Sequence, residues 1–121
     1  LPLPGSAPFH SSLMKPAAAR LADALADLDL QAPQIPVLNN IDVTVENDPA
    51  RIKDALVRQA YGPVRWVESM LAMRAQGLGV VLECGPGKVL AGMAKRIDGD
   101  WQTGAVFDPA SLAETKEMVQ A

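Results

Sequence analysis

The chain has 121 residues, of which 49% are hydrophobic, and its 11 basic and 14 acidic residues give a formal net charge of −3. This length and apolar content suit a folded chain with its own core and exclude a disordered polar segment. The charge balance excludes the basic footprint of a nucleic-acid-binding protein, and no apolar run approaches the roughly 20 residues of a membrane helix. The one cysteine excludes an internal disulfide framework and favours a reducing, cytoplasmic location.

The first predicted element is a helix that begins at Ser11 or Ser12, as its N-cap, and runs to about Leu28. Pro16 falls in its first turn, where a missing N–H costs little. The apolar residues at helical spacing predict one buried face. The residues expected on that face are Met14, Leu21, Leu25 and Leu28.

A short strand is predicted over residues 35–38, at a sheet edge because Pro36 lacks a backbone donor. Asn39 and Asn40 end this strand. Residues 41–45 alternate between apolar and polar, so they either extend the strand or form a small ribbon with it.

The next helix has a clear start signal, with Asp48 as N-cap and Pro49 in the first helical position. It is expected to run to about Ala60, and Gly62 breaks it. Pro63 then opens a further helix that ends before Gly77. The residues expected to be buried by this third helix are Val64, Val67 and Leu71.

The remaining sequence alternates short strands with helices. Residues 80–82 predict a strand buried on both faces, and residues 85–87 a tight turn into a helix that carries Leu90, Met93, Ala94 and Ile97. Residues 105–107 predict a last strand, and Asp108 caps a final helix to about Val119. Such alternation predicts an α/β fold with short, mostly parallel strands flanked by helices.

The single histidine, His10, lies in a Pro-containing loop before the first helix, within residues 5–16, GSAPFHSSLMKP. An imidazole there can reach into a cleft and act as a general base. The chain has no Gly-x-Ser-x-Gly motif, which would present a nucleophilic serine on a strand-to-helix turn. The sequence therefore predicts half of an active site, and the alternative is a surface histidine without a function.

Five segments in order resemble one family. They are residues 5–16, Asn39-Asn40, LVRQ at 56–59, YGPVRW at 61–66 and ECGPGKVL at 83–90. In these segments the chain resembles malonyl-CoA:acyl carrier protein transacylases and the related acyltransferase domains of polyketide synthases. It implies a single fragment, residues 1–121, from the C-terminal part of the large hydrolase-like subdomain. Residues 1–10 would be the connection and catalytic-histidine loop, and residues 11–121 the helices and strands.

The resemblance also implies the roles of two site residues. His10 would take the proton of a serine that attacks malonyl-CoA, and would then help to protonate the leaving thiolate. An imidazole titrates near neutrality, which suits a group that acts as base and then acid. The backbone carbonyl of Gln59 would orient His10. The family's serine, its oxyanion-hole donors and its acyl-selecting arginine would precede this chain, so we expect the isolated chain to be inactive.

Other polar residues near His10 have alternative interpretations. Asn39 and Asn40 either brace the His10 loop through hydrogen bonds or simply end a strand. Asp42 and Glu46 are the nearest acids in sequence, and either could orient His10 in place of Gln59, although we rank them below its carbonyl.

The segment Gly85-Pro86-Gly87-Lys88 is only a weak match to a phosphate-binding loop, because Val89 stands where that motif needs Ser or Thr. A structural turn is the favoured interpretation, with contact of Lys88 to coenzyme A or carrier protein left open. Cys84 is expected to be a small buried side chain. One His and one Cys predict no metal site, and no cofactor is expected.

The family resemblance thus implies a full-length S-malonyltransferase that moves a malonyl group from coenzyme A to acyl carrier protein in fatty acid biosynthesis. Its partners would be malonyl-CoA, acyl carrier protein and the missing N-terminal part of the same enzyme, with no nucleic acid or membrane. Two alternatives stay open: a non-catalytic module for carrier-protein binding or assembly, and an acyltransferase of different acyl specificity.

Overall fold

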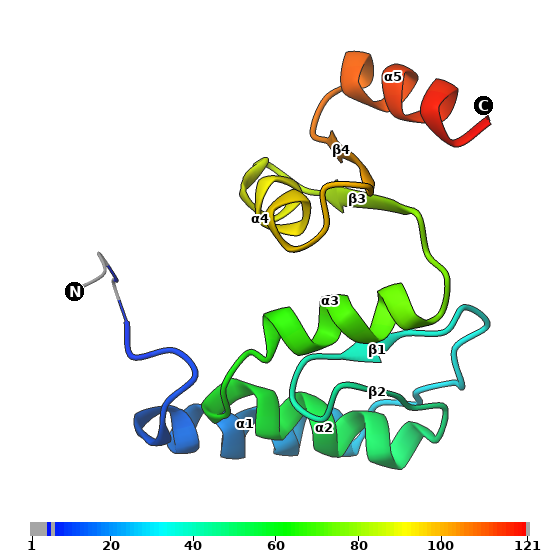
Figure 1. Cartoon of the computed structure of the whole chain (residues 1–121). Coiled ribbons are helices and arrows are strands. Elements are labelled where there is room, and N and C mark those ends of the chain that lie inside the picture. Colours follow the sequence, from blue (N-terminus) through cyan, green and yellow to red (C-terminus); the bar gives the residue numbers. More distant parts are fainter. Residues whose placement is uncertain (1–4, 6, 121) are drawn as a thin grey trace. The chain divides into compact units, whose positions relative to one another are not determined.

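The computed structural model describes residue 5 and residues 7–120, so residues 1–4 and 6 of the expected connection lie outside the described residues, as does residue 121. The chain forms two compact units, Leu1–Ser69 and Met70–Ala121, which are described separately. Helices and short strands alternate along both units, as the α/β prediction requires (Figure 1).

The first unit begins with a 3-10 turn, η1 (Ser12–Met14), and helix α1 (Lys15–Ala26). Ser11 stands at the N-cap position of η1, as predicted, but its hydroxyl makes no capping hydrogen bond and donates instead to the Pro8 carbonyl at 2.7 Å. Pro16 does lie in the first turn.

The buried face of α1 agrees only in part with the prediction, which places Ala17, Ala18 and Ala24 beside the four large residues. Ala18 is its one buried residue, whereas Leu21 and Leu28 are exposed and Leu28 lies beyond the helix end. The reason is that α1 packs against helix α2, and the small Ala18 occupies this face.

Strands β1 (Leu38–Asn39) and β2 (Thr44–Val45) form an antiparallel hairpin in which Leu38 pairs with Val45. This confirms the small ribbon rather than the extended strand. The predicted strand start at residue 35 is wrong, and Ile35 and Val37 are exposed. Pro36 has no N–H to donate to a ladder, so pairing begins only beyond it.

Helix α2 (Pro49–Tyr61) confirms its predicted start, since the Asp48 carboxylate accepts a hydrogen bond from the Arg51 amide at 3.3 Å. Gly62 ends the helix in an extended conformation, and its amide donates to the Arg58 carbonyl at 2.8 Å. Ala55 is buried on the helix face.

Helix α3 (Trp66–Ala75) begins three residues after Pro63 and runs across the boundary between the two units. Ser69 and Met70 are its buried residues. The predicted face is wrong, and the residues that are exposed instead are Val64, Val67 and Leu71. The Ser69 hydroxyl donates to the Arg65 carbonyl, four residues earlier, at 2.7 Å.

The second unit contains a parallel pair of strands, β3 (Val80–Cys84) and β4 (Gln102–Val106), connected through helix α4 (Val89–Ile97). This βαβ arrangement confirms the parallel pairing. The predicted burial of this strand on both faces is wrong, because its three central residues are half-buried and both of its ends are exposed, with Val80 39% exposed. The small core holds Ala91, Ala94 and Trp101, whose indole N–H donates to the Leu78 carbonyl at 2.7 Å.

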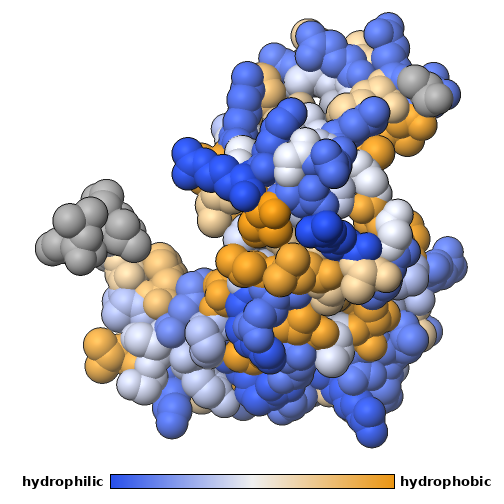
Figure 2. All heavy atoms as spheres, viewed as in Figure 1, coloured by the Kyte–Doolittle hydropathy of each residue, from blue (hydrophilic) through white to orange (hydrophobic). Residues whose placement is uncertain are grey.

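Helix α5 (Pro109–Gln120) starts at the predicted cap, where the Asp108 carboxylate accepts from the Ser111 amide at 2.8 Å. β4 begins three residues before the predicted residue 105. Apolar side chains reach the surface of both units among charged ones (Figure 2). None of the helices in the described part of the chain is long and apolar enough to cross a membrane.

Candidate active site

The candidate site is built on the C-terminal end of α2. The last carbonyls of a helix have no partner inside the helix, so they can accept hydrogen bonds from elsewhere. The chain turns away from the helix axis at Gly62, which leaves the carbonyls of Gln59 and Gly62 available to the loop that carries His10.

His10 uses both carbonyls. Its Nδ1 lies 3.0 Å from the Gln59 oxygen and 3.1 Å from the Gly62 oxygen. Carbonyl oxygens only accept, so Nδ1 must carry the proton that it donates. In the neutral imidazole the other nitrogen, Nε2, then has a free lone pair, which is what a general base requires.

The backbone at His10 is in the left-handed region, with φ of 59°. Residues other than glycine rarely adopt this conformation, and it is held only where the surroundings impose it. The two residues that accept hydrogen bonds from its ring lie 49 and 52 positions further along the sequence. Long-range contacts thus fix the orientation of this side chain.

In the part of the chain that the structure describes, neither Asp42 nor Glu46 forms a hydrogen bond or ion pair with His10, which favours the carbonyl over a carboxylate partner. The Asp42 carboxylate pairs with both terminal nitrogens of Arg58, at 2.8 and 2.7 Å, and hydrogen bonding from that guanidinium lowers the pKa of Asp42. Glu46 accepts from the amides of Asn47 and Asp48 at 3.1 and 3.3 Å.

The two asparagines brace the hairpin and α3 rather than the His10 loop, which corrects the first of the two interpretations. The Asn39 side chain accepts from the Asp42 amide at 2.8 Å. The Asn40 side chain accepts from the Ser69 hydroxyl at 3.3 Å, and its carbonyl from the Arg65 amide at 3.3 Å.

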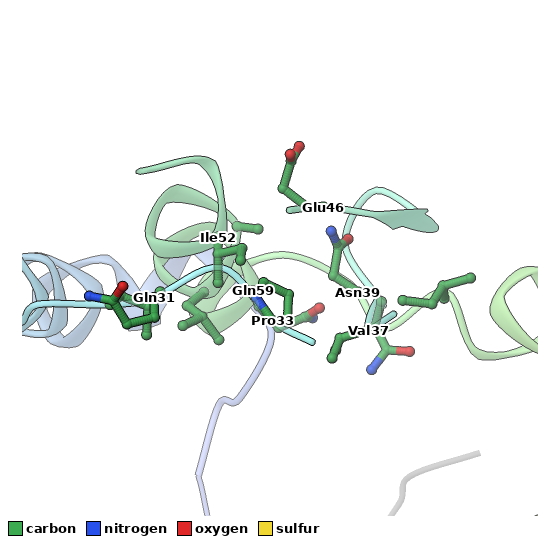
Figure 3. Close-up of a pocket in the computed structure, with 12 residues that line it drawn as sticks. Gln31, Pro33, Val37, Asn39, Glu46, Ile52 and Gln59 are labelled. Carbon is green, nitrogen blue, oxygen red and sulfur yellow. The ribbon is translucent and has the colours of Figure 1, made fainter. Parts of the chain in front are cut away.

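Gln59 contributes its side chain as well as its carbonyl. Its Nε2 donates to the Pro63 carbonyl at 3.3 Å and so spans the turn at Gly62. Gln59 also lines a pocket of about 330 Å³, together with Ile52 on the same helix and with Val37 and Asn39 from the preceding segment (Figure 3). The side chain therefore stabilises the exit from α2, beside an apolar hollow.

Gly62 is a site residue that sequence reasoning missed, because it was interpreted only as a helix breaker. A Cβ at this position would collide with the Ile41 side chain and lie 2.9 Å from the Arg58 carbonyl oxygen. The signal that could have found it is the position of a glycine directly after a helix and within four residues of Gln59.

The helix that follows the Gly85–Lys88 turn already has a carboxylate bound at its N-terminal end. The Glu83 carboxylate accepts from the Ala91 amide at 2.9 Å and so occupies the first turn of α4. Lys88 lies over the Phe107 ring at 4.5 Å. Cys84 is exposed, which corrects the expectation of a buried thiol, because it ends β3 at the edge of a two-stranded sheet.

Comparison with known proteins gives concordant relatives, although no family model matches the chain. The malonyl CoA-acyl carrier protein transacylase of Salmonella typhimurium is 51% identical over 113 residues, which are 93% of this chain and 37% of the relative. That of Escherichia coli K12 is 48% identical over 118 residues, 98% of this chain and 38% of the relative.

Solved structures agree with these relatives. The acyl-carrier-protein S-malonyltransferase of Burkholderia pseudomallei superposes with a TM-score of 0.90 at 62% identity, over 97% of this chain and 38% of that one. A malonyl-transacylase in complex with a type II polyketide synthase acyl-carrier protein gives 0.91 at 48% identity, over 98% and 38%.

The chain has the α/β acyltransferase fold of these structural neighbours. The chain belongs to the malonyl CoA-acyl carrier protein transacylase family. It spans 37–38% of the length of the curated relatives that head the comparison.

Proposed function

We propose that this chain is the C-terminal part of an acyltransferase that moves a malonyl group from coenzyme A to acyl carrier protein in fatty acid biosynthesis. The observation that carries the proposal is the hydrogen bonding of His10 Nδ1 to two backbone carbonyls, in a chain 48–51% identical to such transacylases. The proposal treats residues 1–121 as one fragment of the large subdomain. It includes a cytoplasmic location, which depends only on the sequence argument from a single cysteine.

In the proposed reaction His10 is the general base, and the Gln59 carbonyl orients it. Nε2 takes the proton of a serine hydroxyl supplied by the rest of the enzyme, and the serine oxygen bonds to the malonyl carbonyl carbon. The carbon–sulfur bond then breaks, and the imidazolium returns its proton to the coenzyme A thiolate. The second half runs in reverse, with the phosphopantetheine thiol of the carrier protein as acceptor and the serine hydroxyl regenerated.

The names of the relatives support the choice of substrates. The curated relatives are named for malonyl-CoA and acyl carrier protein, and one solved relative is a complex with an acyl-carrier protein. Because the chain matches less than two-fifths of these proteins, the nucleophile and the group that selects the acyl chain belong to the rest of the enzyme in this proposal.

The test is a transfer assay with the full-length enzyme that carries this sequence. Malonyl-CoA and acetyl-CoA are compared as donors to holo-acyl carrier protein, and acyl-enzyme formation is followed by intact mass. We expect a malonyl adduct and its transfer. Preference for acetyl-CoA would indicate a different acyl specificity, and carrier binding without any adduct would indicate a non-catalytic module.

The isolated chain, incubated with malonyl-CoA, is expected to form no covalent adduct, because in this proposal the nucleophile lies outside it. Intact mass spectrometry measures this directly, with the full-length enzyme as positive control. A stoichiometric malonyl adduct on Ser6, Ser11 or Ser12 would contradict the proposed division of the active site.

A further inference from the structure

We propose that the turn of the β1–β2 hairpin, residues 40–43, positions His10 by holding the segment that leaves α2, so that the Gly62 carbonyl shares the Nδ1 proton with Gln59. We call residues 40–43 the hairpin turn. The inference rests on the proposed role of His10 as the base. It adds Asp42 and Arg58 as positioning residues and Gly62 as the second acceptor.

The first contact of the hairpin turn is the ion pair of Asp42 with Arg58. Two parallel hydrogen bonds of 2.8 and 2.7 Å fix the guanidinium in direction as well as in distance. Arg58 is also the residue whose carbonyl accepts from the Gly62 amide, at 2.8 Å. The ion pair therefore holds Arg58, the helical residue to which the Gly62 amide is hydrogen-bonded.

Two further contacts lie at Gly62 and just beyond it. The Ile41 side chain packs so closely on Gly62 that it leaves no room for a Cβ there. The Asn40 carbonyl accepts from the Arg65 amide at 3.3 Å. Consecutive residues of the hairpin turn thus contact residues 58–65, the exit segment of α2, before, at and after Gly62. These contacts fix the direction of the Gly62 carbonyl.

Backbone strain occurs on both sides of this segment. Among the described residues, only His10 and Val43 have positive φ without being glycine, at 59° and 57°. This conformation is especially unfavourable for a β-branched valine, and such strain persists only where surrounding contacts impose it. One strained residue donates to the exit segment, and the other ends the turn that holds it.

The second acceptor has a specific consequence for the imidazole. With one carbonyl, the ring can pivot about a single hydrogen bond, whereas two carbonyls at 3.0 and 3.1 Å restrict that rotation. Nε2 then has a fixed direction in which to meet the serine hydroxyl. Misplacement of a reacting group by about 1 Å can cost on the order of 10²-fold in rate, so this restriction is large enough to measure.

The experiment uses the full-length enzyme and the variants Asp42→Asn and Arg58→Lys, each of which removes the two-pronged pair. We expect kcat for malonyl transfer to fall by about tenfold with little change in KM, because positioning of a base acts on the transition state. Asp54→Asn is the matched control. It removes the other partner of Arg58, 2.7 Å away on the same helix, without touching the hairpin turn, and should change kcat by less than about twofold.

A second readout does not depend on activity. Long-range ¹H–¹⁵N spectra report which nitrogen of the neutral His10 ring carries the proton. We expect the Nδ1–H form in the wild type and Asp54→Asn, and a mixture with the Nε2–H form in Asp42→Asn and Arg58→Lys. A pure Nδ1–H form with wild-type kcat in both Asp42→Asn and Arg58→Lys would overturn the inference.

The Gly62 acceptor is tested by relief of a collision. Gly62→Ala should lower kcat because the added methyl group meets Ile41, and the double variant with Ile41→Val, which removes the Cδ1 atom, should recover part of the loss. Wild-type kcat in Gly62→Ala would contradict the role of Gly62. If His10→Ala were fully active, the proposed function itself would fail, whereas the tautomer measurement would still decide the positioning.

Discussion

The unpaired backbone groups at helix ends find different kinds of partner in the two units. At the C-terminal end of α2, the Gln59 and Gly62 carbonyls accept from a histidine that lies 49 and 52 residues away. At the N-terminal end of α4, the Ala91 amide donates to Glu83, which is only eight residues away. One helix end is thus open to a distant loop, and the other is closed by its own strand.

The difference shows why a motif is a poor guide to chemistry without its surroundings. The Gly-Pro-Gly-Lys turn has the composition of an anion-binding loop, yet the carboxylate of Glu83 already occupies the first turn of the helix that follows. The α2 end has no such signature. Its proposed function depends on carbonyls, which every residue has, and on the glycine that exposes them.

The largest expected effect is at the open end. His10→Ala removes the proposed base and should lower the transfer rate of the full-length enzyme by about 10²-fold or more, the usual scale for a positioned acid–base group. Steady-state transfer to acyl carrier protein measures this. Lys88→Ala, at the closed end, is the comparison variant and should have a much smaller effect, since Lys88 lies over Phe107.

Gln59→Ala gives a finer comparison at the same end. Alanine keeps the backbone carbonyl and loses only the side-chain hydrogen bond to the Pro63 carbonyl, so its rate should lie much nearer the wild type than that of His10→Ala. A loss from Gln59→Ala as large as that from His10→Ala would mean that the side chain, and not the carbonyl, has the main role.

Local signals in the sequence predicted two of the helix starts well. Asp48 before Pro49, and Asp108 before Pro109, both cap their helices as expected, because a cap depends on residues within one turn. The parallel strands were also predicted, although not their full lengths. The buried faces of α1 and α3 were predicted poorly, since spacing shows which residues share a face and not which of them meets a neighbour.

The site was predicted in part. The contact of His10 with the Gln59 carbonyl followed from the family resemblance, and no spacing rule connects residues 49 apart. Gly62 could not be predicted in the same way, because its contribution is a carbonyl oxygen whose direction is set by packing on Ile41. The exposure of Cys84 likewise depends on how many strands accompany β3.

A smaller effect is expected at the closed end of α4. Glu83→Ala removes the acceptor of the Ala91 amide and should lower the free energy of unfolding by about 1 kcal/mol, the usual cost of losing an N-terminal cap. Urea denaturation measures this. Glu117→Gln, at an exposed position of α5, is the control, with a change within about 0.5 kcal/mol. Equal stability of Glu83→Ala and wild type would mean that the α4 terminus is not closed by this carboxylate.

The smallest effect concerns acid stability at the start of α5, a second closed end. Hydrogen bonds from the Ser111 amide and hydroxyl, helped by the charge of Lys88, lower the pKa of Asp108 in the folded state. A carboxyl group with a depressed pKa contributes stability that is fully present above its unfolded pKa, about 3.9, and is lost as the pH falls through the folded pKa.

Asp108→Asn keeps an oxygen that can cap the helix but cannot titrate. Urea denaturation from pH 6 down to acid pH should therefore show wild type losing more stability than the variant, with the difference confined to the region below about pH 4. High salt should reduce only the part due to Lys88, because short hydrogen bonds are screened less than separated charges. Parallel curves for the two proteins at all pH values would show that the charge of Asp108 does not contribute to closing this helix end.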